Sequence, residues 1–265
     1  MLRILGRLLV LVLIAGVALQ LFFVLRVISM RWIDPQSTAF ERSEVWQLAA
    51  QSEKPFVWKQ RWLAYKQISD NMKRAVIASE DGDFAYHDGV EWDAIERAWK
   101  RNKRAERQAE KRSKRTGKVI SPKLVGGSTI TQQLAKNLFL SGERSFMREG
   151  QELTEGLEYV IAFAPGFMRK GQELVITFAL EAFLPKERIL EIYLNSVELG
   201  QGVFGVEAAA QHYYRKSAAK LSAYEAARLA VMLPRPKFFE KTPNSAYVSS
   251  RAQTIVARMA DAELP

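Results

Sequence analysis

The chain has 265 residues, of which 48% are hydrophobic and 26% charged, with no cysteine and only two histidines. This length suits one domain with a small appendage, and this charged fraction is typical of a folded protein, not a disordered one. The missing cysteines exclude disulfides, thiol nucleophiles and Cys-ligated zinc, and two histidines disfavour a multi-His metal site, which leaves carboxylates, hydroxyls, amides and cations for any chemistry.

The first predicted element is an apolar helix near the N-terminus. Residues 8–25, LLVLVLIAGVALQLFFVL, carry no charge and one strongly polar side chain, Gln20. A helix of this length spans about 27 Å, which matches the hydrocarbon thickness of a bilayer. A cleaved signal peptide is the alternative, but Ala18 is followed by further apolar residues, which favours an uncleaved anchor over residues 1–30. Arginines flank both ends, so charge alone does not set the orientation.

The first cluster of chemical interest is SEDGDFAYHDG at residues 79–89. The apolar stretch AVIA at residues 75–78 leads into it, so we expect Glu80 to leave a packed helix and enter a loop. A carboxylate with an apolar wall and an acidic neighbour has a raised pKa, which suits a general base. A loop whose acids only cap helices is the alternative, and the spacing does not fit an EF-hand.

A helix and a basic segment follow. Trp92, Ile95 and Trp99 recur at helical spacing and predict a helix that begins just before Trp92. Residues 100–118, KRNKRAERQAEKRSKRTGK, then carry a net charge of +8, which leaves only +2 of the total +10 for the rest of the chain. Such concentrated charge is more typical of a solvated arm than of sequence-specific nucleic-acid recognition, so we expect no nucleic-acid partner. Anionic lipid is the better match for a protein at a membrane.

The second cluster, GGSTITQQLAKNLFL, covers residues 126–140. Its paired glycines permit tight turns, and the residues after them supply hydroxyls, amides and a cation: Ser128, Thr129, Gln132, Gln133 and Lys136. Such an array can hold a sugar and its phosphates, because backbone N–H groups at a helix start favour anions. The cluster lacks the Gly-Lys-Ser/Thr of a P-loop. A polar loop before an ordinary helix is the alternative.

An eight-residue segment then occurs twice. FMREGQEL at residues 146–153 recurs as FMRKGQEL at residues 167–174 with one difference. Two copies are too few for a solenoid, so we interpret residues 146–174 as a local duplication that adds a helical turn or a loop. The duplication leaves Glu152 and Glu173 as two candidates for one acidic position.

Two further helices are predicted towards the C-terminus. Pro185 stands where a helix can start, and Ile189 and Ile192 continue with helical spacing. Ser222 and Glu225 form a capping-box pattern before another apolar stretch. No stretch alternates with period two. We therefore expect a mainly α-helical domain over residues 46–240, followed by a C-terminal tail over residues 241–265.

The two clusters, in this order, closely resemble the glycosyltransferase family 51 peptidoglycan polymerases. With its single anchor the chain is most similar to the monofunctional biosynthetic transglycosylases of that family. The resemblance implies a lysozyme-like helical glycosyltransferase domain in the periplasm of a bacterium, with the N-terminus in the cytoplasm and one helix in the inner membrane. It continues through ordered blocks at residues 169–173, 186–195, 202–214 and 221–236.

The resemblance also implies a reaction: polymerisation of lipid II into β-1,4-linked glycan strands, with inversion and release of polyprenyl pyrophosphate. Glu80 matches the family's general base. Pyrophosphate is a good leaving group, so cations, not a strong acid, should assist its departure. The matching substrate-binding positions are Asp81, Phe84, His87, Ser128, Thr129, Gln132, Gln133, Lys136, Asn137, Arg144, Arg169 and Lys170.

The family's second catalytic glutamate is ambiguous in this chain. Counted forward from Asn137, the family spacing places it at Glu152; counted back from KERILEIYLN, it is Glu173. We prefer Glu173, because its copy of the repeat retains Arg169 and Lys170.

The resemblance sets the remaining expectations. The interval between the two clusters is longer than in the family, so part of residues 100–121 is an insertion, either a site for anionic headgroups or a disordered, dispensable arm. No metal site or cofactor is required, and a divalent cation such as Mg²⁺ or Mn²⁺ is left open. The expected partners are lipid II, the polyprenyl-pyrophosphate-linked glycan, membrane lipid and other cell-wall synthesis proteins. A lysozyme-like lytic enzyme and an inactive membrane-anchored scaffold are the alternative functions.

Overall fold

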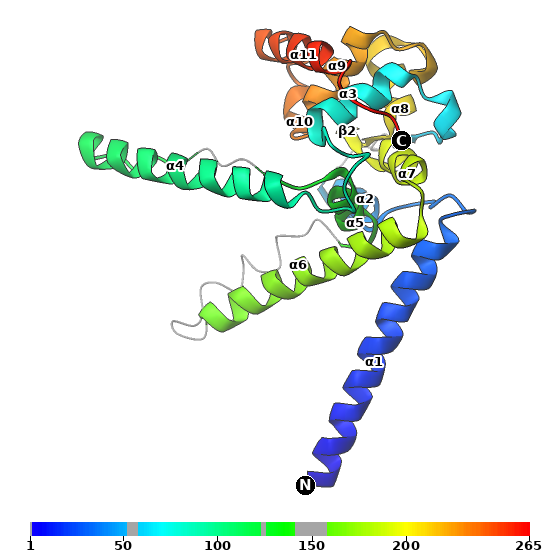
Figure 1. The fold of residues 1–265 in the computed structure, drawn as a ribbon, viewed down its shortest axis with the longest axis vertical. Helices are drawn as coiled ribbons and strands as arrows, with labels where there is room; N and C mark the ends of the chain where they lie inside the picture. The colour runs from blue at the N-terminus through cyan, green and yellow to red at the C-terminus, as the bar shows by residue number, and fades with distance from the viewer. Residues whose placement is uncertain (1, 52–57, 123–125, 141–157) are drawn as a thin grey trace.

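Three long helices extend from one helical lobe in the computed structural model of the chain, which describes residues 2–51, 58–122, 126–140 and 158–265. The long helices are α1 (Leu2–Ser29), α4 (Trp92–Thr116) and α6 (Glu158–Phe183), and they leave the lobe in different directions (Figure 1). The lobe contains α2 (Ala39–Gln51), α3 (Asp70–Glu80), α5 (Ile130–Phe139), α7 (Lys186–Ser196), α8 (Val206–Tyr214), α9 (Ala223–Met232), α10 (Pro236–Phe239) and α11 (Ala246–Arg258), with short 3₁₀ turns at Tyr65–Gln67 and Ala218–Lys220. The expected mainly α-helical fold is confirmed.

The lobe is built around α3. Its N-terminus is capped by Ser69, whose hydroxyl accepts the Met72 N–H at 3.2 Å. The apolar side chains of α3, including Met72, Val76 and Ile77, are fully buried against α9 and α11. Burial of a whole apolar face holds the helix rigidly, so its last residue, Glu80, has a fixed position.

The predicted helix starts near the C-terminus are confirmed. Pro185 is the N-cap of α7. The hydroxyl of Ser222 accepts the Glu225 N–H, and the Glu225 carboxylate accepts the Ser222 N–H at 2.9 Å, which is the capping box of α9. Residues 241–265, expected as a tail, instead supply α11, which buries Val248 and Ile255 in the same core.

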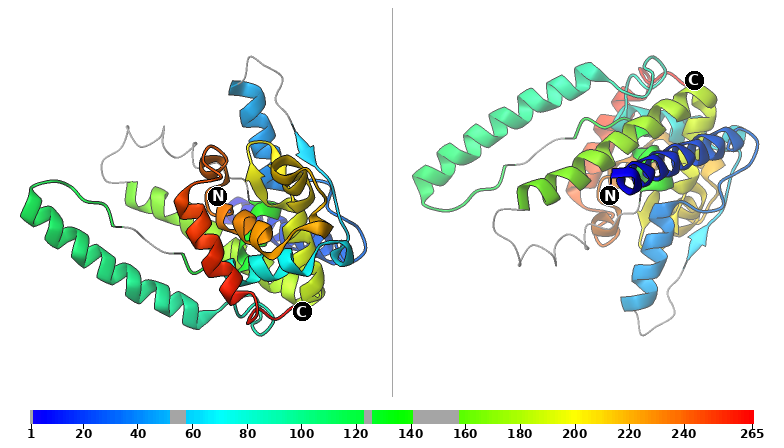
Figure 2. Two further views of the ribbon diagram at one scale, coloured as in Figure 1. Left: turned by 90° about the horizontal axis from the view of Figure 1, so that it is seen from above. Right: turned by 90° about the horizontal axis from the view of Figure 1, so that it is seen from below.

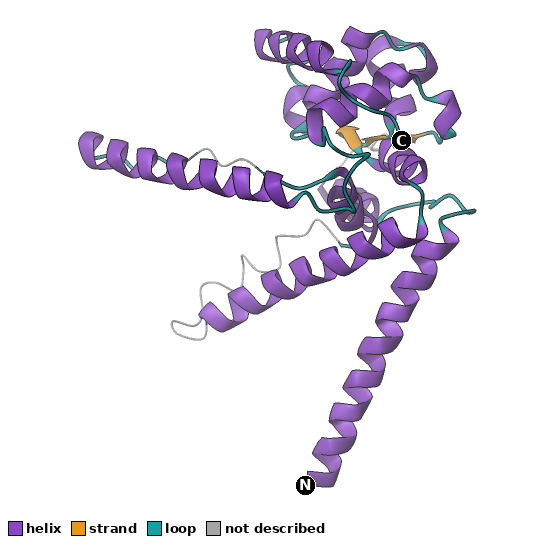
Figure 3. Cartoon of the chain, in the orientation of Figure 1, coloured by secondary structure: helices purple, strands orange, loops and turns teal. Residues whose placement is uncertain are grey.

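A small three-stranded sheet lies in the lobe (Figure 3). Its strands are β1 (Lys59–Gln60), β2 (Glu198–Gly200) and β3 (Val203–Phe204), in the order β1-β3-β2, with β1 parallel and β2 antiparallel to β3. Strands of two or three residues cannot show an alternating pattern, which explains why the sequence predicted none. Gly205 follows β3 at φ 78°, where a Cβ would lie 2.6 Å from the Asn195 carbonyl oxygen.

Helix α1 is long and apolar enough to cross a membrane over Arg3–Ser29, with a mean hydropathy of 3.0. It packs against α6, where the Gln20 and Gln172 amides exchange hydrogen bonds of 2.7 and 3.2 Å. Its C-terminal end is tied to the lobe by Arg188, whose Nε donates to the Met30 carbonyl oxygen at 2.8 Å. Helix α1 therefore has a defined orientation relative to the lobe.

Helix α4 begins at Trp92 as predicted and continues through the basic segment to Thr116. The expectation of a disordered arm is wrong for residues 100–116, because they form the C-terminal part of this helix, with Ala109 buried. Gly117 ends the helix in the left-handed conformation, φ 67°. Both views of Figure 2 show α4 extending sideways from the lobe, and Figure 1 shows that it runs across the direction of α1.

Candidate active site

Glu80 is the last residue of α3 and follows the buried residues Ala75, Val76 and Ile77 of that helix. Its Oε2 accepts a hydrogen bond from Gln133 Nε2 at 2.9 Å, and Ser79 Oγ lies 3.4 Å from Oε1. Burial raises the pKa of the Glu80 carboxyl, and the charge of Asp81 adds to this, whereas the hydrogen bonds from Gln133 and Ser79 act in the opposite direction. The raised pKa expected from the sequence is therefore present, and it suits a proton acceptor.

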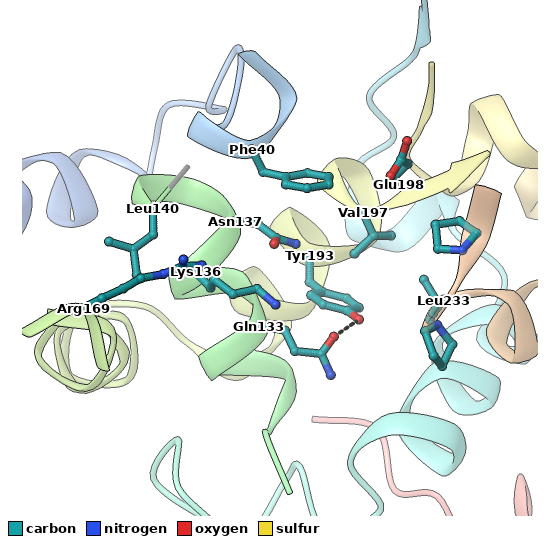
Figure 4. Close-up of a pocket in the computed structure, with 12 residues that line it drawn as sticks. Phe40, Gln133, Lys136, Asn137, Leu140, Arg169, Tyr193, Val197, Glu198 and Leu233 are labelled. Carbon is teal, nitrogen blue, oxygen red and sulfur yellow. Dashed lines mark hydrogen bonds between the residues drawn. The ribbon is translucent and has the colours of Figure 1, made fainter. Parts of the chain in front are cut away.

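Tyr193 fixes the amide that holds Glu80. The Tyr193 hydroxyl donates to Gln133 Oε1 at 2.8 Å, so the Gln133 NH₂ group must face the carboxylate (Figure 4). Complete burial raises the pKa of Tyr193 far above its usual value, which keeps the phenol protonated as a donor. Helices α7, α5 and α3 thus form one chain of hydrogen bonds that ends at Glu80.

Asp81 joins the loop after α3 to the start of α5. Its Oδ2 accepts the Ile130 N–H at 2.9 Å, and its Oδ1 lies 2.8 Å from His87 Nε2. Because His87 Nδ1 accepts the Gly89 N–H at 3.1 Å, the proton of the neutral ring is on Nε2 and points at Asp81. Asp81 and His87 therefore hold the loop in place.

Three more of the predicted substrate-binding side chains also have structural contacts. Phe84 is fully buried, with Lys186 Nζ 4.6 Å from its ring centre. Thr129 Oγ1 donates to the Gly89 carbonyl oxygen at 2.6 Å and caps α5, and Gln132 completes that capping box by accepting the Thr129 N–H at 3.1 Å. These side chains orient the two sequence clusters relative to each other.

A cleft of about 340 Å³ lies beside Gln133 (Figure 4). It brings together four side chains that the sequence singled out, from α5 and α6: Gln133, Lys136, Asn137 and Arg169. Phe40 and the segment around Leu233 form apolar parts of its wall. Two cations in a partly enclosed cleft can stabilise a departing phosphate group.

The sequence reasoning missed two cleft residues, Tyr193 and Glu198. In the sequence, Tyr193 stands out only as part of the apolar face of a predicted helix. Glu198 was visible as one acid within the apolar run SVELG. Burial raises the pKa of Glu198 to about 7, against the attraction of Lys237, whose Nζ lies 3.5 Å from Glu198 Oε1 and also pairs with Glu44.

Three predicted residues line a second cavity of about 390 Å³, which we call the α4–α6 groove. These are Ser128, Gln132 and Lys170, and with Asn102 they form its polar part. Lys170 also pairs with Glu173, which is buried on α6. Its lining consists of Val90, Trp92, Ile95, Ala98, Trp99, Asn102, Gly127, Ser128, Gln132, Lys170 and Leu174.

Two candidates, Arg144 and Glu152, lie outside the described residues, as does the first copy of the repeat. The second copy is part of α6. Within the part of the chain that the structure describes, no three His, Cys, Asp or Glu side chains are grouped so that they could hold a metal ion.

Comparison with known proteins places this site in a family. Residues 48–260 match the family described as Transglycosylase. The chain is 50% identical over 252 residues to a biosynthetic peptidoglycan transglycosylase of Burkholderia thailandensis, covering 95% of this chain and 84% of the relative. It is 47% identical to the protein of that name in Paraburkholderia phytofirmans, covering 95% and 90%, and 48% identical to that of Herminiimonas arsenicoxydans, covering 93% and 91%.

Proposed function

Because this chain belongs to the transglycosylase family and is a peptidoglycan glycosyltransferase, we propose that it polymerises lipid II with Glu80 as the general base. The observation that carries the proposal is the setting of Glu80. Its carboxyl has a raised pKa, and it is held by Gln133 at the edge of a cleft that also contains Lys136 and Arg169.

The proposed step is an inverting displacement. Glu80 takes the proton of the acceptor sugar's 4-hydroxyl as that oxygen forms a bond to the anomeric carbon of the donor. The bond between the anomeric carbon and the phosphate oxygen breaks, and polyprenyl pyrophosphate leaves with the electron pair. Lys136 and Arg169 line the cleft where this negative charge would develop, so they supply the stabilisation that a divalent cation would otherwise give. The proposed step requires no cofactor, and assistance by a divalent cation such as Mg²⁺ or Mn²⁺ stays open.

Glu173 is the second glutamate of this mechanism. It is buried on α6 and paired with Lys170, so it can hold the ammonium in a fixed orientation towards a phosphate. The neighbouring Arg169 lines the cleft. The pairing of Glu173 with Lys170, and the position of the adjacent Arg169 in the cleft, support the register in which the second copy of the repeat is the functional one.

Helix α1 would anchor the enzyme in the bacterial inner membrane, with the N-terminus in the cytoplasm and the lobe in the periplasm. The substrate is itself lipid-linked, so an enzyme held at the membrane surface meets it directly. Helix α4 runs across the direction of α1 and carries most of the net positive charge (Figure 1), so it would lie along the anionic headgroups.

Polymerisation of labelled lipid II by the detergent-solubilised chain tests the proposal. Wild type should give polymer, and Glu80→Gln should lower the rate by roughly 100-fold or more, the usual contribution of a general base. Glu173→Gln should also abolish polymer, whereas Glu152→Gln should retain it. Loss of activity with Glu152→Gln and not with Glu173→Gln would reverse the assignment of the second glutamate.

The same preparation separates the alternatives. Incubation with mature, lipid-free peptidoglycan should release no soluble fragments, since the reaction needs a pyrophosphate donor; release would indicate a lytic enzyme. A folded wild-type chain that binds lipid II and forms no polymer would indicate a scaffold.

A further inference from the structure

Helix α1 packs on the two helices that give the cleft its amides and cations. The Phe23 ring contacts the Phe139 ring edge-to-face, with 5.2 Å between the ring centroids. The guanidinium of Arg26 lies over the same Phe139 ring, 5.5 Å from its centre. Phe139 is the last residue of α5, which also carries Gln133 and Lys136. The apolar helix therefore reaches the end of a helix that lines the cleft.

A second contact joins α1 to α6. Gln20 is the one strongly polar side chain in the apolar run 8–25, and its amide exchanges two hydrogen bonds with the amide of Gln172. Gln172 directly precedes Glu173 and belongs to the same helix as Arg169. In apolar surroundings an amide pair fixes the rotation of one helix relative to the other, because turning either helix leaves the amides without partners.

The last turns of α1 are part of the core of the lobe. Val27 and Met30 are buried among its apolar side chains. Arg188 of α7 binds the Met30 carbonyl oxygen at 2.8 Å and the Asp34 carboxylate at 2.7 Å. Figure 1 shows α1 and α6 converging at the lobe. Length and hydropathy are enough to anchor a helix in a membrane, so anchoring alone does not account for these contacts.

We propose that α1 is a positioning element of the active site, in which Phe23 and Arg26 hold the end of α5 and Gln20 holds α6. The inference rests on the proposed function, because it takes the reaction from there. The three side chains touch no reacting atom and act through the two helices that they hold. The membrane helix thus contributes to the rate of the reaction and does more than keep the lobe at the membrane.

The C-terminal end of α5 is the end that needs this support. Its N-terminal end is fixed within the lobe by the capping box of Thr129 and by the Asp81 carboxylate, which accepts the Ile130 N–H. At the other end, Phe139 is only half-buried against the core. Lys136 lies in this last turn, so the α1 contacts are nearest to the part of α5 that carries the cleft's cation.

The reaction depends on α5 and α6 at the same time. Lys136 comes from α5 and Arg169 from α6, and both line one cleft. Helix α5 also carries Gln133, which holds Glu80 at 2.9 Å. A displacement of about 1 Å in groups that act on a transition state can lower the rate by about 100-fold. Loosening α5 should therefore lower kcat more than it weakens substrate binding.

The first test compares Phe23→Ala with a matched control, the double substitution Leu21→Ala with Leu25→Ala. Both variants remove the same number of carbon atoms from α1, but Leu21 and Leu25 are 57% and 64% exposed. Polymerisation of lipid II is measured with the detergent-solubilised full chain below the unfolding transition of every variant. Phe23→Ala should lower kcat by about tenfold and change KM by less than about threefold, and the control should change neither.

The second test does not need activity. Amide hydrogen exchange of residues 134–139 should be faster in Phe23→Ala than in wild type or the control, because the end of α5 opens more readily without its contact. Gln20→Leu keeps α1 apolar and leaves the Gln172 amide without its partner. It should speed exchange around Gln172 and leave α5 less affected.

Equal kcat values for Phe23→Ala and the control would overturn the proposal, whether both stay at the wild-type value or both fall. A rise in KM without a fall in kcat would also overturn it, since α1 would then act on access of the substrate. So would unchanged exchange in α5. A wild-type chain that forms no polymer would refute the proposed function instead, and the exchange measurement would still decide whether α1 holds α5.

Discussion

The lobe and helix α4 contain the same kinds of charged side chain in opposite surroundings. In the lobe, the Asp81 carboxylate is almost completely buried and holds both His87 and the Ile130 N–H. On α4, Glu110 pairs with Lys114 at 2.6 Å, but most of each side chain is exposed. Removing a buried acceptor leaves its hydrogen-bond donors unpaired away from water, whereas water replaces an exposed partner. In the lobe, stability should therefore depend on the position of each charge. On α4, only the total number of charges should matter.

The largest effect should follow from removing Asp81. Asp81→Ala leaves the Ile130 N–H and the His87 ring without their acceptor inside the lobe, so it should lower the free energy of unfolding by about 4 kcal/mol. Thermal unfolding in detergent measures this. Asp83→Ala is the matched control, because Asp83 belongs to the same loop and is exposed. Similar losses for the two variants would contradict the difference between buried and exposed acids.

The burial of Glu198 should make the stability of the folded chain depend on pH. Its pKa is about 7 in the folded chain, against an ordinary value of 4.5, so between these values the folded chain keeps a proton that the unfolded chain releases. Wild type should therefore lose stability relative to Glu198→Gln as the pH rises from 4.5 to 7, by roughly 3 kcal/mol in total, and no further above that range. Below about pH 4.5 the difference between the two proteins should be constant.

Unfolding of both proteins across this pH range provides the measurement. Burial also raises the pKa of Glu41 to about 7, but Glu41 is present in both proteins and its effect cancels in the difference. A difference that does not change with pH would mean that Glu198 is ionised with an ordinary pKa.

Glu80 and Glu198 show how much of the site could be predicted from the sequence. Glu80 and Gln133 were identified because each lies in a local motif, and the burial of α3 behind Glu80 follows from an apolar stretch directly before it. Glu198 was missed because its pKa is raised mainly by burial, with Lys237 lowering it and Glu44 raising it, and all three influences arise only after folding. A local sequence pattern therefore predicts which side chains carry the chemistry, whereas long-range packing determines their burial, their charged neighbours and so their pKa.

Long-range packing also bears on the residues that the motifs contain. Phe84 and Thr129 were expected at the substrate, yet one is in the core and the other caps α5. A motif shows that residues belong together, but it does not separate those that touch a ligand from those that hold the site in shape. Arg251 gave no sequence signal at all, since its helix was expected to be a tail; its charge acts on Glu80 from α11.

On α4, removing charge should weaken lipid binding without affecting stability. The double substitution Arg104→Gln with Arg107→Gln removes two exposed cations. It should lower the affinity of the detergent-solubilised chain for micelle-dispersed phosphatidylglycerol by about 2 kcal/mol, or roughly thirtyfold at low salt. The thermal unfolding temperature should not change. The control is the double substitution Lys241→Gln with Arg258→Gln, which removes the same charge from exposed positions on the lobe and should have little effect on lipid affinity. An equal loss of lipid affinity in the control would mean that binding depends only on the net charge of the whole chain.

The smallest effect should come from Glu110→Gln, which breaks the Glu110–Lys114 pair. Attraction to Lys114 lowers the pKa of the Glu110 carboxyl, yet the group is fully solvated, so its loss should leave the unfolding temperature unchanged. The substitution also removes one negative charge from a basic helix, so phosphatidylglycerol affinity should rise, by less than the double arginine variant lowers it. A drop in unfolding temperature would show that α4 needs specific pairs to stay helical. A rise in affinity at constant stability would show that the helix acts through its total charge.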